Sequence, residues 1–135
     1  MKMKKLILLV SILFLFNSCE LEDNNFSVEI LPVHSVEMPT EFVLGETYQI
    51  TMQYYRPTNC HSPYGIYYEK ELNTRTCAIK NLVEGRGDCA PVENILVEET
   101  FDFHVTNTGN YVFKFWTGHN DEGNDTFMTY DIPVN

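Results

Sequence analysis

The sequence predicts an all-β fold, a sandwich or small barrel of about seven short strands that begins at Phe26 of the 135-residue chain. Apolar and polar residues alternate with a period of two, as in residues 48–54, where Tyr, Ile, Met and Tyr share one face and Gln, Thr and Gln the other. From Phe26 onward, no long stretch keeps an apolar stripe at helical spacing. Turn-forming residues separate the alternating segments at regular intervals, which is typical of a sandwich.

Each expected strand is a short alternating segment bounded by turn residues. The expected strands cover residues 28–36, 47–54, 64–71, 75–83, 100–105, 111–116 and 126–134. Segments rich in Pro, Gly, Asn and Asp connect them, and the longest are residues 56–63, 84–91 and 118–125. If successive strands reverse direction, these three connections lie together at one end of the sandwich. We expect recognition at that end, because the strands are occupied by packing and the loops are free to make contacts.

The segment TNTGNY at residues 106–111 resembles the turn into strand F of immunoglobulin-like domains. In those domains a Tyr two positions after a Gly ties its hydroxyl back to the preceding turn. The resemblance covers roughly Ser27 to Asn135 and implies an immunoglobulin-like β-sandwich over residues 26–135. Phe113 stands where an antibody domain has a Cys, and the Trp of strand C is missing. The chain is therefore not expected to be an antibody-type domain.

Residues 1–18 have the organisation of an export signal. Lysines within residues 2–5 precede residues 6–16, which are apolar apart from Ser11. A basic stretch followed by an apolar run is the order found in signal peptides. The run of about 11 residues is too short for a membrane-spanning helix, which needs about 20. The sequence therefore predicts an exported protein.

Residues 16–19, Phe-Asn-Ser-Cys, resemble a bacterial lipoprotein lipobox, whose Cys receives diacylglycerol before cleavage. Phe16 and Asn17 depart from the commonest pattern, which has Leu and a small residue there, and looser boxes of this kind resemble those of Bacteroidota lipoproteins. The resemblance implies a lipid on Cys19, an acidic tether over residues 19–25 and attachment to the outer membrane. Acidic residues after the Cys are similar to signals that send such lipoproteins to the cell surface. The alternatives are a solvated acidic linker and a plain secretory signal with Cys19 free or bridged.

The other cysteines, Cys60, Cys77 and Cys89, allow one disulfide in three pairings. An oxidising exported compartment favours such a bridge. Cys60 and Cys89 lie in two connections expected at the same end of the sandwich, whereas Cys77 lies mid-strand and could face the core as a small hydrophobe. We predict the Cys60–Cys89 pairing, with Cys77–Cys89 as its chief rival. No C-x-x-C spacing supports a zinc ribbon or a redox motif.

The histidines share no metal-ligand spacing. His61 and His119 lie in two of the connections expected to converge, with Asp121 near His119, so these residues are candidates for a binding site. Residues 120–125 lack the alternating oxygen ligands of a calcium loop, and a polar hairpin tip is the simpler interpretation. No G-x-S-x-G or H-E-x-x-H motif and no specified nucleophile–base pair occurs. We therefore predict no catalytic residue, no metal, no cofactor and no enzymatic activity.

Charge and aromatic residues limit the function classes. With 9 Lys and Arg against 19 Asp and Glu, the net charge is −10, which makes nucleic acid an unfavourable partner. In the alternating pattern, Tyr55, Tyr67 and Trp116 fall on the side of their strands that faces away from the core. Exposed Tyr and Trp side chains are common platforms for binding sugars or proteins. The alternative is that these rings are covered or shelter an apolar edge. Two classes remain open, a non-enzymatic accessory or protein-interaction module of the envelope and a surface carbohydrate-binding module of a polysaccharide-uptake system.

Overall fold

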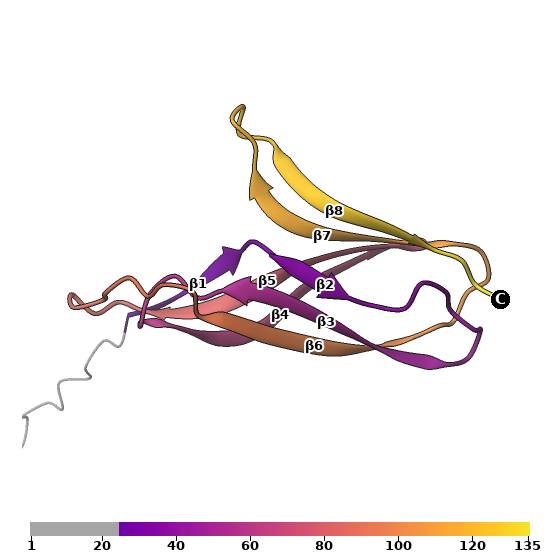
Figure 1. The fold of residues 1–135 in the computed structure, drawn as a ribbon, viewed down its shortest axis with the longest axis horizontal. Helices are drawn as coiled ribbons and strands as arrows, with labels where there is room; N and C mark the ends of the chain where they lie inside the picture. The colour runs from indigo at the N-terminus through magenta and orange to yellow at the C-terminus, as the bar shows by residue number, and fades with distance from the viewer. Residues whose placement is uncertain (1–24) are drawn as a thin grey trace, which may run out of the picture.

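Residues 25–135 are described by a computed structural model, which contains eight strands and no helix in this range (Figure 1). The strands are β1 (Phe26–Leu31), β2 (Ser35–Glu37), β3 (Thr47–Tyr55), β4 (His61–Glu71), β5 (Thr74–Glu84), β6 (Leu96–His104), β7 (Tyr111–His119) and β8 (Asp125–Ile132). Within the described range there is accordingly no helix that could span a membrane. The predicted signal peptide, Cys19 and the tether up to residue 24 lie outside the described residues.

Two sheets pack face to face and confirm the predicted all-β sandwich. Strand β5 is central to the five-stranded sheet, with β4 along one edge. Its other edge pairs with β7 over Thr74–Cys77 and with β1 over Ile79–Glu84, and β8 pairs with β7. The second sheet has the order β2-β3-β6. Strands β5 and β7 run parallel, as strands two apart must when each connection reverses the chain direction.

The expected strand over residues 28–36 is in fact two strands in different sheets. Strand β1 ends just before Pro32, which has no N–H to donate to a neighbouring strand. The Val33 N–H donates to the Trp116 carbonyl in the larger sheet at 2.8 Å, and the His34 N–H donates to the Gln53 carbonyl in the smaller sheet at 2.7 Å. The chain therefore crosses from one sheet to the other here, which gives eight strands where the sequence predicts about seven.

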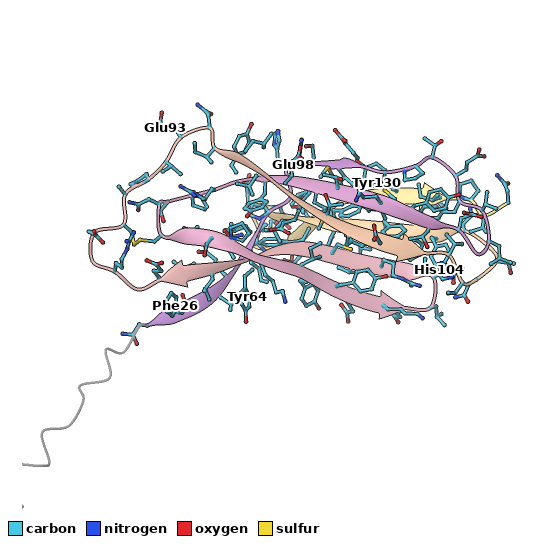
Figure 2. All side chains as sticks on the ribbon, turned by 90° about the horizontal axis from the view of Figure 1, so that it is seen from below. Phe26, Tyr64, Glu93, Glu98, His104 and Tyr130 are labelled. Carbon is cyan, nitrogen blue, oxygen red and sulfur yellow. A yellow bond between two sulfur atoms is a disulfide. The ribbon has the colours of Figure 1, made fainter. Side chains whose placement is uncertain are left out.

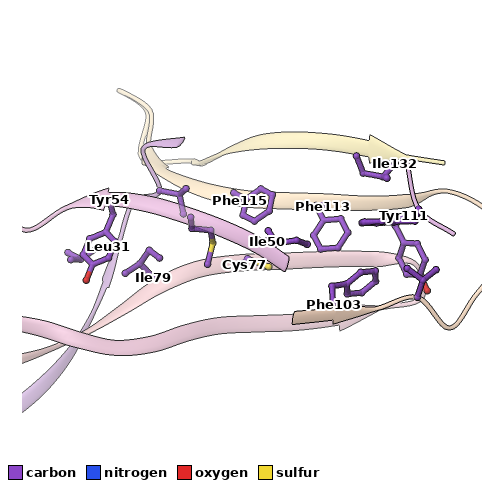
Figure 3. Packing of buried hydrophobic residues seen from close by; sticks show 14 residues of the cluster. Leu31, Ile50, Tyr54, Cys77, Ile79, Phe103, Tyr111, Phe113, Phe115 and Ile132 are labelled. Carbon is purple, nitrogen blue, oxygen red and sulfur yellow. The ribbon is translucent and has the colours of Figure 1, made fainter. Parts of the chain in front are cut away.

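The core lies between the sheets and is dominated by aromatic rings at one end. The Phe103 ring centroid lies 4.9 Å from that of Tyr111 and 5.0 Å from that of Phe113, both edge-to-face. Such pairs are favoured beyond the area they bury. Figure 3 shows these rings with Ile50 and Ile132, and it shows Ile79, Leu31 and Tyr54 further along the sandwich. The inward faces of both sheets thus fill one continuous core.

Tyr111 makes the turn contact that the immunoglobulin-like resemblance implies. Its hydroxyl accepts hydrogen bonds from the backbone N–H of Asn107 at 3.0 Å and of Thr106 at 3.3 Å. Burial raises the pKa of Tyr111, but these hydrogen bonds and the nearby Arg75 charge outweigh it, so the net pKa lies below its ordinary value. This contact and the two packed sheets make the fold an immunoglobulin-like β-sandwich, as predicted.

The disulfide joins Cys60 to Cys89, which confirms the predicted pairing, and their Cα atoms are 5.5 Å apart. Figure 2 shows it at the end of the molecule opposite His104. At the same end the Gly85 N–H donates to the Asn25 carbonyl at 2.6 Å and fixes the start of the described chain. Cys77 is free and fully buried, and this burial raises the pKa of its thiol to about 12.

Candidate functional site

The outer face of the larger sheet carries a groove at the point where the partner of β5 changes from β7 to β1. The β7–β8 hairpin bends away from the rest of the sandwich there (Figure 1). The hollow measures about 280 Å³. Its apolar walls are formed by the large side chains of Ile30, Tyr67, Trp116 and Phe127. The rest of the lining consists of the small residues Thr76 and Ala78 and the acidic residues Glu69 and Asp125. The groove therefore combines apolar walls with two carboxylates.

Trp116 is held in one orientation by the hairpin to which it belongs. Its indole Nε1–H donates to an Asp125 carboxylate oxygen at 2.9 Å. The same oxygen lies 3.0 Å from His119 Nδ1, and the His119 ring meets the indole edge-on with centroids 5.3 Å apart. Phe127 is the cross-strand partner of Trp116, so both rings lie on the outer face of the hairpin. Asp125 thus positions Trp116 in the groove.

Tyr67 forms the opposite wall from strand β4. Its side chain is exposed, and its hydroxyl donates to Glu69 Oε2 at 3.1 Å. This hydrogen bond and the Glu69 charge raise the pKa of Tyr67. On the β8 side, the Lys114 ammonium lies 4.3 Å from the centroid of the Phe127 ring, a cation–π contact. Aromatic rings from three strands therefore surround the groove, and each has a defined polar or charged neighbour.

Of the four predicted binding residues, the structure brings only two together. Trp116 and His119 meet through Asp125, and Asp121 lies exposed near the tip of the same hairpin. His61 is buried elsewhere, with Nε2 2.7 Å from a Glu29 carboxylate oxygen and Nδ1 2.7 Å from the Thr58 hydroxyl. Within residues 25–135 there is no group of three or more His, Cys, Asp or Glu side chains that could hold a metal ion.

The expectation that three long connections meet at one end is only partly correct. The disulfide, together with an isolated bridge between Thr58 and Pro91, does join the connections after β3 and β5. The third connection, between β7 and β8, lies apart from them (Figure 1). The register of this hairpin shifts between Trp116 and Gly118, and Gly118 has a φ of 110°. A shift of this kind bends a strand, and the alternation of residues 111–116 gives no sign of it.

Sequence reasoning missed Glu69, Asp125 and Phe127 as groove residues. Phe127 could have been found from the hairpin register, since strands that flank residues 118–125 place it opposite Trp116. Glu69 could not, because its proximity depends on how β4 and β7 flank β5. Tyr55, the third aromatic residue that the sequence places on the outward side of its strand, lies in a different hollow beside His34, with the two ring centroids 4.7 Å apart.

Comparisons with protein-family models, with curated proteins and with solved structures find no match to this chain. The residues of the groove nevertheless indicate its chemistry. Aromatic faces pack against C–H-rich surfaces, and carboxylates accept hydrogen bonds from hydroxyl groups. A groove with both kinds of group suits a ligand that is apolar on its faces and rich in hydroxyls at its edges.

Proposed function

We propose that this protein is a non-enzymatic, lipid-anchored carbohydrate-binding module of the bacterial envelope. The observation that carries the proposal is the groove between Tyr67 and Trp116, with Glu69 and Asp125 at its edge. Of the two function classes that the sequence leaves open, this groove favours the carbohydrate-binding module over the protein-interaction module. At about 280 Å³ the groove is slightly smaller than typical small-molecule sites, and like them it combines mostly apolar walls with a few placed polar groups.

A sugar ring matches the groove in both of its properties. The C–H bonds of a pyranose form an apolar face that packs on an aromatic ring, and its equatorial hydroxyls point outward. Asp125 and Glu69 each accept one hydrogen bond from a groove ring, and a carboxylate accepts up to about four, so both keep acceptor capacity for hydroxyls. These same bonds hold Trp116 and Tyr67 in place, which reduces the side-chain entropy lost on binding.

The charge of the site favours a neutral glycan over an acidic one. The two side chains of the groove lining that are charged at neutral pH, Glu69 and Asp125, are both carboxylates, and the whole chain carries a net charge of −10. An anionic polysaccharide would be repelled by this field, most strongly at low ionic strength. We therefore propose that neutral hexose units are the ligands of the groove.

The proposed location is the outer membrane, on the cell surface or the periplasmic face, through a lipid on Cys19. The basic and apolar order of residues 2–16 and the lipobox-like residues 16–19 support this proposal. The Cys60–Cys89 disulfide supports an oxidising compartment outside the cytoplasm. The acyl chains would have to supply the attachment, because an acidic protein gains nothing from anionic headgroups.

A second candidate, a protein-interaction module, is favoured by a different observation. Strand β1 presents Phe26, Val28 and Ile30 outward, and their side chains are 50%, 52% and 40% exposed. Val28 pairs with Leu82 on β5, which extends the apolar row across the sheet. Exposed apolar patches of this kind are common at protein interfaces. This row lies beside the groove, of which Ile30 is a wall.

A glycan array probed with a soluble form starting at Glu20 tests the proposed function. We expect retention by a defined neutral polysaccharide and loss of at least about tenfold in affinity for Trp116→Ala and for Tyr67→Ala, the scale of losing one buried aromatic contact. Tyr55→Ala is the matched control, because Tyr55 is also an exposed tyrosine but lies outside the groove. Its binding should equal that of the unmodified chain.

The array result also separates the two candidates. Retention that survives both groove substitutions would remove the groove as the binding site. If no glycan is retained, the second candidate, the protein-interaction module, is tested by cross-linking the protein in membranes and purifying it with any bound partner. Val28→Asp is compared with the unmodified chain in this experiment. That substitution places a charge in the exposed apolar row, and it should abolish capture of a protein partner while the groove residues stay unchanged.

A further inference from the structure

A second hollow lies between the two sheets, on the open side where the edge strands β4 and β6 face each other. It measures about 430 Å³. Strand β4 contributes Ile66, Tyr68 and Lys70, strand β6 contributes residues 101–104, and Arg75 of β5 lines it from within the sandwich. The Tyr68 and Phe101 rings meet edge-on across it, with centroids 5.8 Å apart. This cavity is separate from the groove on the outer face and shares no residue with it.

Arg75 is a buried cation on the inner face of β5, and only 2% of it is exposed. Its Nη1 donates hydrogen bonds to the backbone carbonyls of Leu72 at 2.8 Å and Thr74 at 2.9 Å. The guanidinium carbon lies 5.1 Å from the Tyr111 ring centroid and 5.6 Å from that of Phe103. These contacts fix the guanidinium at the base of the cavity.

The charge of Arg75 has no acidic partner in the described part of the chain. None of the ion pairs among residues 25–135 involves it, although the chain contains 19 acidic residues. Its Nε has no hydrogen-bond partner in the same range. Both hydrogen bonds of the guanidinium leave from Nη1, so the Nε–Nη2 edge, which binds carboxylates side-on, is not used by them. A buried charge without a counterion is costly, and a bound anion removes that cost.

We propose that the cavity between β4 and β6 binds a small organic carboxylate, with Arg75 as the residue that recognises its charge. Lys70 adds a second positive charge at the exposed edge of the cavity, and Tyr68 adds a hydroxyl. Burial raises the pKa of Tyr68, and the Arg75 charge, which lines the same cavity, partly offsets this effect. The site is distinct from the groove, so it gives the protein a second ligand.

The walls of the cavity determine what kind of carboxylate fits. Ile66, Tyr68, Phe101 and Phe103 make them largely apolar. Asp102 and His104 also line the cavity from β6, and both side chains are exposed at its rim. A dianion or an inorganic phosphate would leave charge against apolar walls and near the Asp102 carboxylate. A monocarboxylate with an apolar body instead places its charge on Arg75 and its body on the rings.

Titration of the full-length chain in detergent micelles with benzoate tests the proposal. Nuclear magnetic resonance of the arginine Nε–H groups reports on Arg75 directly, and benzamide is the neutral probe of the same shape. We expect a saturable shift of the Arg75 Nε–H signal with benzoate and none with benzamide. Lys70→Met should weaken benzoate binding about fivefold, as expected for loss of an exposed charge contact. Arg86→Ala is the matched control, because Arg86 pairs with Glu84 away from the cavity and its loss should leave the affinity unchanged.

Three results would overturn the proposal. Equal shifts with benzoate and benzamide would mean that the carboxylate is not recognised. Benzoate shifts confined to residues outside the cavity would place the ligand elsewhere. Displacement of benzoate by an equal concentration of inorganic phosphate would contradict the assignment to a carboxylate with an apolar body. Because Arg75 itself is not replaced, none of these results can be attributed to unfolding of the sandwich.

Discussion

Removal of the Cys60–Cys89 disulfide should lower the stability of the sandwich by an amount that the sequence separation of 29 residues determines. In the chain-entropy treatment, closing a loop of this length removes about 12 cal/mol/K from the unfolded chain, or about 3.6 kcal/mol at 25 °C. With an unfolding entropy of about 2.1 cal/mol/K per residue over residues 25–135, this corresponds to a fall of about 15 °C in Tm.

Differential scanning calorimetry of Cys60→Ala/Cys89→Ala measures this change, and the double variant should also be insensitive to reductant. The native loops keep other links, since the Asn59 N–H donates to the Ala90 carbonyl at 3.1 Å and the Ala90 N–H donates to Asn59 Oδ1 at 2.9 Å. We therefore expect the folded variant to retain its far-UV spectrum. A fall of less than about 3 °C would refute the reasoning, because the bridge would then not constrain the unfolded chain.

Three further predictions concern single residues. Cys19→Ser should abolish labelling by an alkyne fatty acid and accumulate as precursor, and equal labelling of both forms would contradict lipidation. Tyr111→Phe should cost about 1–3 kcal/mol in unfolding free energy measured by urea, because the Asn107 and Thr106 N–H groups lose their acceptor; an unchanged midpoint would contradict this. Cys77, with its pKa raised from 9.0 to about 12, should resist maleimide at pH 8 until the protein unfolds. As the pH rises, the thiol of the unfolded chain ionises before the buried thiol of the folded protein. The stability that Cys77 contributes is therefore complete below about pH 9 and is lost between pH 9 and 12, and Cys77→Ala should reduce this alkaline loss of stability.

Alternation and turn residues were sufficient to predict the sandwich, since they report directly on which residues face the core. Tyr48 to Tyr54 and Tyr111 to Phe115 have the predicted inward faces, and the Tyr111 turn contact follows from the Gly109 spacing. The break at Pro32 was missed because the apolar pattern continues through it. One proline without a donor N–H is enough to send the chain to the other sheet, and a search for period-two patterns does not register it.

The candidate site was harder to predict because it depends on which strands become neighbours. The alternating pattern alone identifies Trp116 as outward-facing. Its contact with Asp125 can be predicted only if the register of the β7–β8 hairpin is known, and its proximity to Tyr67 only if the order of β4, β5 and β7 in the sheet is known. Arg75 illustrates the same limit. Its place in the alternation predicts an inward position, but that it pairs with no acidic side chain among residues 25–135 becomes visible only when the two sheets are assembled.

If Cys19 carries the proposed lipid, the contact between Gly85 and Asn25 determines which end of the sandwich lies nearest the membrane. A Cβ at position 85 would lie 2.6 Å from the Asn25 carbonyl oxygen, so only glycine allows the chain to enter the sandwich so close to the disulfide. A lipid on Cys19 reaches Asn25 through a tether of at most about 20 Å. The disulfide end and His104 lie at opposite ends of the molecule (Figure 2), so with this anchor the disulfide end would face the bilayer and the His104 end would point away from it. The Arg75 cavity, which residues 101–104 of β6 help to line, would then open away from the membrane and be accessible to solutes in the surrounding medium.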